Sequence, residues 1–143
     1  MKISERLPYL VVVTVLVLGA GVLAWRFISP LTETSTVNVR IPALSAMAVK
    51  GVKAFDANCA QCHGTNGAGG DRGPPLVHDI YNPGHHADAA FFLAMKRGVR
   101  EHHWAFGDMP PTPQVAEDDI YAIVRYIREL QEENGIFYKL HRM

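Results

Sequence analysis

Two cysteines and a histidine lie close together in the middle of the sequence. Two residues separate Cys59 from Cys62, His63 follows directly, and the 143-residue chain has no other cysteine. Two thiols at this spacing can each form a thioether with one vinyl group of haem, and the adjacent imidazole can then ligate the iron. The spacing therefore predicts one covalently attached haem c with His63 as an axial ligand.

Two other kinds of site use a cysteine pair of this spacing. A dithiol redox motif is expected after a strand in a βαβ unit, whereas a helical pattern precedes Cys59. A zinc site needs two further thiol or imidazole ligands at a recognisable spacing. Haem attachment is the hypothesis that requires neither feature.

A second axial ligand is expected from the loop before the last predicted helix. Met109 lies there between Gly107 and the double proline Pro110-Pro111, in a segment that can present a side chain without helical hydrogen bonds. Thioether sulfur and imidazole both ligate haem iron, so Met109 is the predicted ligand and a histidine is the alternative. Met95 lies among phenylalanines in a predicted helix, which is typical of a core residue.

Five histidines lie between the cysteine motif and the last predicted helix. They are His78, His85, His86, His102 and His103. The run from His102 to Trp104 is predicted to line the haem edge, where imidazole and indole N–H groups reach the propionates. A copper-binding histidine cluster is the alternative, since paired imidazoles suit copper and zinc.

Three helical segments are predicted to position these residues in an all-α fold. They cover about 45–58, 88–97 and 116–134, with Ser45 and Asp88 as the N-caps of the first two. No segment shows the alternating pattern of a strand. The apolar positions of the first helix are Met47, Val49, Val52 and Phe55. Those of the third form a single stripe of Ile120, Ile123, Val124, Ile127 and Leu130.

These features together resemble class I cytochrome c, and the resemblance covers about residues 45–134. Gly51 and Tyr126 match the positions at which the family's N- and C-terminal helices cross. The resemblance implies three main helices around one covalent haem. It also implies a one-electron carrier that is not an enzyme and has no catalytic residue.

The resemblance also implies roles for two loops. In the segment Gly73-Pro74-Pro75-Leu76, it gives the Pro74 carbonyl a hydrogen bond from His63 Nδ1 and places Leu76 among the cofactor-binding residues. Met109 and Pro110 resemble the loop that closes the opposite face of the haem. The family pattern gives none of the five histidines a role.

The N-terminal part of the chain is strongly apolar. No formal charge lies between Leu7 and Trp25, and the run to Ile28 is long enough, at about 1.5 Å per residue, to cross about 30 Å of hydrocarbon. The alternative is a cleaved secretory signal with a cleavage site at residues 22–24. The predicted organisation is a cytoplasmic N-terminus (1–6), a transmembrane anchor (7–28), a linker (29–43), a haem domain (44–135) and a tail (136–143).

Charge and topology limit the functions that fit this chain. The formal net charge is zero, which argues against a nucleic-acid partner. Lys2 and Arg6 precede the apolar run, so the haem domain is expected in the periplasm, beside the bacterial inner membrane. We therefore predict a carrier with membrane redox complexes as electron donor and acceptor. A fixed haem c subunit of a larger membrane oxidoreductase is the alternative, and a haem enzyme or gas sensor is a third class.

Overall fold

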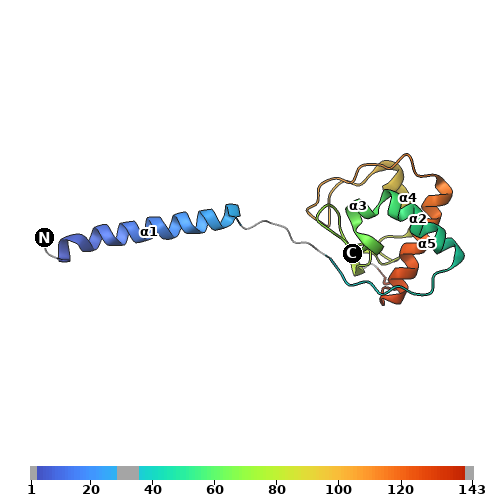
Figure 1. Ribbon diagram of the computed structural model, residues 1–143, viewed down its shortest axis with the longest axis horizontal. Coiled ribbons are helices and arrows are strands. Elements are labelled where there is room, and N and C mark those ends of the chain that lie inside the picture. Colours follow the sequence, from blue (N-terminus) through green and yellow to red (C-terminus); the bar gives the residue numbers. More distant parts are fainter. Residues whose placement is uncertain (1–2, 29–35, 141–143) are drawn as a thin grey trace. The chain divides into compact units, whose positions relative to one another are not determined.

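The structure is a computed structural model that describes residues 3–28 and 36–140 (Figure 1). The chain divides into two compact units, one around helix α1 (Ile3–Ile28) and one that contains every other helix. Parts of three predicted segments lie outside the described residues. These parts are 1–2 of the cytoplasmic N-terminus, 29–35 of the linker and 141–143 of the tail.

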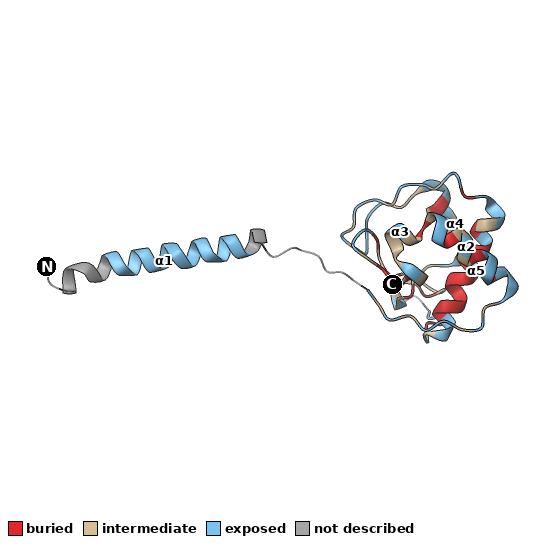
Figure 2. Cartoon of the chain, in the orientation of Figure 1, coloured by how far each residue is buried: buried red, intermediate tan, exposed pale blue. Residues whose placement is uncertain are grey.

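Helix α1 contains the apolar run. Its side chains are exposed from Tyr9 to Trp25, as the pale blue colour in Figure 2 shows. Within residues 3–28 and 36–140, no helix has both the length and the apolar character that crossing a membrane requires. The predicted transmembrane anchor over 7–28 therefore gains no support from the structure.

The second unit is helical. Its elements are α2 (Ala46–Asn58), α3 (Ala60–His63), α4 (Asp88–Arg97), α5 (Glu117–Glu133) and the 3-10 turns η1 (Thr65–Gly67) and η2 (Asp79–Tyr81). The described part of this unit has no β-strand, only an isolated bridge between Val99 and Met109. The prediction of an all-α domain with helices near 45–58, 88–97 and 116–134 is confirmed.

The crossing of α2 and α5 is the main helix contact of this unit (Figure 1). Gly51 lies at the crossing, where an added Cβ would overlap the carbonyl of Ala122 and lie 2.9 Å from Tyr126 Cβ. The rings of Phe55 and Tyr126 meet edge to face, with their centroids 5.6 Å apart. Gly51 therefore lets the two backbones approach, as the resemblance implied.

The buried face of α2 includes the predicted Phe55, and Val52 packs against the buried core, but the rest of the face differs from the predicted one. Ala48, Gly51 and Phe55 are buried, whereas Met47 and Val49 are 55% and 48% exposed. Small residues are buried here because α5 comes too close for longer side chains. In α5 the whole predicted apolar stripe is buried, and red residues follow that helix in Figure 2.

Gly51→Ala should destabilise the protein by about 1–3 kcal/mol, because the new methyl group overpacks the helix crossing. Intrinsic helix propensity acts in the opposite direction, since alanine is favoured over glycine by about 1 kcal/mol. Guanidinium denaturation measures the net effect. The matched control is Ala57→Gly on the exposed face of α2, which should cost about 1 kcal/mol through propensity alone. If the Gly51→Ala protein were more stable than wild type, α2 and α5 could not approach each other at Gly51 as closely as described.

The second half of the predicted linker packs on the second unit. Val37 N donates to Ala68 O at 2.8 Å, and Arg40 N donates to Asn134 Oδ1 at 3.0 Å. Val39 and Leu44 pack against the buried core. The domain therefore includes residues 36–43, which the sequence assigned to the linker because they show no helical periodicity.

The C-terminal tail also contacts the domain, which the sequence left open. Ile136 is buried, and Lys139 N donates to Asn82 Oδ1 at 3.3 Å. Lys139 Nζ pairs with Asp79 Oδ1 at 2.5 Å, and Gly84 leaves no room for a Cβ beside the Lys139 carbonyl. The described part of the tail, residues 136–140, therefore lies along residues 79–84.

Candidate functional site

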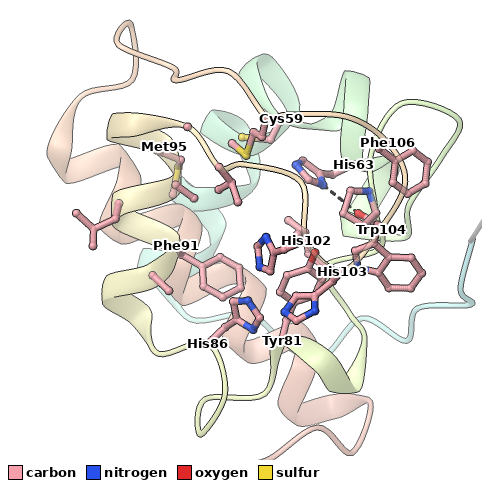
Figure 3. Close-up of a pocket in the computed structure, with 18 of the residues that line it drawn as sticks. Cys59, His63, Tyr81, His86, Phe91, Met95, His102, His103, Trp104 and Phe106 are labelled. Atoms are coloured by element: carbon pink, nitrogen blue, oxygen red, sulfur yellow. Dashed lines mark hydrogen bonds between the residues drawn. The ribbon is translucent and has the colours of Figure 1, made fainter.

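The cysteine motif begins at the C-terminal end of α2. Cys59 N donates to Phe55 O at 2.7 Å, and His63 N donates to Cys59 O at 3.0 Å, so the motif continues as the short helix α3. Cys59 is buried and Cys62 is half-buried (Figure 3 labels Cys59). Burial, aided by the neighbouring Cys62, raises the pKa of Cys59 to about 11. Redox cysteines have lowered pKa values, so this environment argues against a dithiol motif.

A backbone carbonyl orients His63. Its Nδ1 lies 2.9 Å from Pro74 O, along the dashed line in Figure 3. A carbonyl oxygen can only accept, so Nδ1 bears the proton and Nε2 has the lone pair that a metal needs. Burial lowers the pKa of His63, and the hydrogen bond to Pro74 opposes this shift. The lowered pKa favours the neutral imidazole that ligation of a metal requires.

The glycine-rich segment after His63 wraps the cysteine motif. Gly64 has φ 72°, and an added Cβ would overlap the carbonyl of Gly69. At Gly73 an added Cβ would lie 2.9 Å from Cys62 O. Gly69 N donates back to His63 O at 2.7 Å. These close approaches hold the loop against the backbone of the two cysteines.

A cavity of about 440 Å³ opens beside the motif. Its lining is almost entirely apolar. It comes from α2, α3, α4 and α5, from the segment between α3 and α4 (residues 64–87), and from the segment between α4 and α5 (residues 98–116). Five of the predicted site residues line it, namely Cys59, His63, Pro74, Leu76 and Met109. Cys62 is not part of the lining and lies on the adjoining turn of α3.

Backbone contacts with the end of α4 hold Met109. Its N–H and carbonyl both bond to Val99, each at 2.9 Å. The Met109 carbonyl passes so close to Gly98 that an added Cβ there would lie 2.5 Å away. Met95, predicted as a core residue, is buried and also lines the cavity. Two thioethers therefore border the cavity, and only Met109 comes from a loop.

Residues 48–131 match the cytochrome c family. The chain belongs to the cytochrome c family. This match covers more than half of the chain and agrees with the cysteine motif, the cavity and the helix crossing. A search of curated proteins found no match. Members of the family bind haem c covalently, and Cys59 and Cys62 are placed for the two thioethers in this cytochrome c.

One buried polar atom in the cavity wall of this cytochrome suits a haem propionate. Trp104 Nε1 is buried and makes no hydrogen bond of regular geometry within the described residues, although it interacts weakly with the Tyr81 side chain. A buried N–H without a partner costs about 1–3 kcal/mol, so this indole suits an acceptor that enters the cavity. A haem propionate is such an acceptor. His102 and His103 line the cavity beside Trp104, at the place predicted from the sequence.

Two histidine pairs from separate loops meet in this cytochrome. The ring centroids of His85 and His103 are 5.0 Å apart, and those of His86 and His103 are 5.2 Å apart. Burial lowers the pKa of both His86 and His103, and the neighbouring imidazoles lower each further. His78 lies apart from these pairs and packs on Trp104, at a centroid distance of 5.1 Å.

Proposed function

We propose that this cytochrome c carries one electron at a time, with His63 and Met109 as the two axial ligands of its haem iron. Bound haem supplies reversible one-electron chemistry. The observation that supports the proposal is that backbone contacts hold both ligands, His63 through Pro74 and Met109 through Val99. Ligands that keep their places in both oxidation states leave little to reorganise when the electron moves.

The remaining residues of the site serve that role without catalysis. The Pro74 carbonyl keeps the proton on His63 Nδ1 and so keeps Nε2 available. Phe55, Leu76 and the side chains of α5 form an apolar wall that excludes water from the iron. Trp104 Nε1 is placed to donate to a propionate at the cavity edge.

A redox titration of the purified, haem-loaded protein tests this proposal. We expect one reversible transition that follows a one-electron Nernst curve, with the same midpoint in the oxidative and reductive directions. We also expect rapid exchange with soluble one-electron mediators. Hysteresis between the two directions would mean that an axial ligand leaves the iron on reduction, which the carrier proposal forbids.

A fixed haem c subunit of a membrane oxidoreductase is the second candidate. Three apolar side chains of the tail, Phe137, Tyr138 and Leu140, are exposed although their backbone lies on the domain. Exposed apolar groups that lie together are typical of protein contacts. A partner that co-purifies in mild detergent, and is lost with Phe137→Ser, would favour this candidate over a free shuttle.

We further propose that the domain works on the periplasmic side of the bacterial inner membrane, held there by residues 7–28. One observation of the sequence supports this part, namely the uncharged apolar run from Leu7 to Trp25. Such a run is costly to expose to water and is stabilised by lipid. The protein should stay with membranes through a high-salt wash. Soluble protein whose N-terminus follows Ala24 would replace the anchor with a cleaved signal.

A further inference from the structure

Four histidines gather at the edge of the haem cavity, beyond the groups that the carrier role uses. The candidate ligand nitrogens of His85, His86 and His103 all lie within 4.8 Å of one another. The ring centroid of His102 lies 4.2 Å from that of His103. Figure 3 shows His86, His102 and His103 side by side.

Backbone carbonyls set the orientation of three of these imidazoles. Nδ1 of His85 and Nδ1 of His86 each lie 2.8 Å from Ile80 O. Nδ1 of His102 lies 2.8 Å from Arg100 O. Because a carbonyl only accepts, each Nδ1 bears a proton, and in the neutral ring this leaves the lone pair on Nε2. The same arrangement fixes histidine ligands at metal sites, where the second ring nitrogen donates to a carbonyl or carboxylate.

Hydrogen bonds from α5 hold the loop that contains His85 and His86. Buried Arg128 donates to Tyr81 O at 2.8 Å and to the carbonyl of His86. Its guanidinium also pairs with Asp88 Oδ1 at 2.7 Å, which offsets the positive charge close to the cluster. The histidine pair is therefore supported by a buried hydrogen-bond network.

The loop that contains His103 runs from Val99 to Met109, and its two ends are joined by hydrogen bonds. The Val99–Met109 bridge joins its two ends. Glu101 N donates to Asp108 Oδ1 at 2.9 Å, and Gly107 N donates to Glu101 Oε2 at 2.5 Å. Both loops thus hold their histidines on a fixed backbone.

We propose that His85, His86 and His103 bind a divalent transition metal, separate from the haem iron. A set of neutral imidazoles without thiolates suits Cu²⁺ and Zn²⁺, and Cu²⁺ binds more tightly in the Irving–Williams order. Zinc–nitrogen bonds of about 2.0–2.1 Å in a tetrahedral site put the nitrogens about 3.4 Å apart. The observed spread of up to 4.8 Å is wider, so metal binding requires the imidazoles to move closer, above all that of the exposed His103. The fourth position is open to water or to His102.

Equilibrium dialysis of the haem-loaded protein, with its purification tag removed, tests the site with Cu²⁺ and with Zn²⁺. We expect one metal ion per chain in addition to the haem iron, with Cu²⁺ bound more tightly. The electron paramagnetic resonance spectrum of the Cu²⁺ complex should show hyperfine splitting from several nitrogens. This measurement on wild-type protein does not depend on the folding of any variant. No bound metal, or copper without nitrogen ligands, would overturn the proposal.

Variants locate the site. His85→Ala and His103→Ala should each weaken metal binding at least about tenfold, as even loss of an outer contact does at metal sites. The matched control is His78→Ala, which removes an imidazole outside the cluster and should bind metal as wild type does. If the two variants bind metal unchanged, the site lies elsewhere. If wild type binds none while the variants shift the haem spectrum, the imidazoles serve the haem alone.

Discussion

Replacing both Cys59 and Cys62 with alanine should abolish covalent haem attachment and leave little folded domain. The cavity of about 440 Å³ is lined by apolar groups of α2, α4 and α5, so those groups lose a packing partner when no haem fills it. Unfilled cavity volume in cores costs about 24 cal/mol per Å³. A loss on that scale is comparable to the whole stability of a small domain, which is about 5–15 kcal/mol. Circular dichroism should therefore show loss of most helical signal.

Mass spectrometry and solvent extraction measure the covalent part of this prediction. The wild-type mass should include one haem, and acidified organic solvent should leave the pigment on the protein. The matched control is Ala60→Ser, a change between the two cysteines that keeps both thiols and should keep the attached haem. Wild-type protein that releases its haem into the solvent would refute covalent attachment.

Met109→Ala should convert a closed, six-ligand iron into one with an open position. The variant should lose the far-red absorption that marks sulfur on ferric iron, and its reduced form should bind carbon monoxide. Its potential should fall by a sizeable part of the span of about 0.8 V that axial ligands set, because a thioether favours the reduced state. Absorption spectra and a redox titration of wild type and variant measure both effects.

The second thioether at the cavity is the control for this experiment. Met95 is buried on α4, and Met95→Leu keeps its volume while removing sulfur, so the far-red band should remain. A band that survives Met109→Ala but disappears in Met95→Leu would move the ligand to α4. If neither change removes the band, His102 and His103 would be the next residues to substitute.

Local patterns predicted the helices well, and packing between helices explains the errors. The apolar stripe of α5 repeats at helical spacing, so it was recognised without knowledge of its partner. On α2, hydropathy favoured Met47 and Val49, yet the close approach of α5 selects Ala48 and Gly51 for the buried face.

The start of α4 differs from the prediction by one residue. Asp88 was expected to cap this helix, but the N-cap is Ala87 and Asp88 is the first helical residue. Its carboxylate pairs instead with Arg128 of α5, 40 positions away. Local sequence contains no sign of such a contact.

In the site, too, features set by local sequence were predictable, whereas features set by long-range contacts were not. Cys59, Cys62 and His63 are recognisable because their chemistry is local and one helical turn positions all three. The meeting of the 85–86 and 102–103 histidine pairs was not predictable, because irregular loops without periodicity bring them together. The only available signal was that the histidines occur in adjacent pairs.

Carbon monoxide binding by the reduced wild-type protein tests the central claim most directly. The claim is that this cytochrome c keeps two protein ligands on its iron, with Met109 held in place by Val99, and so carries electrons without catalysis. A difference spectrum near neutral pH should show little carbon monoxide complex, and peroxidase activity should be negligible. Ready formation of the complex by wild-type protein would contradict the claim and favour a haem enzyme or gas sensor.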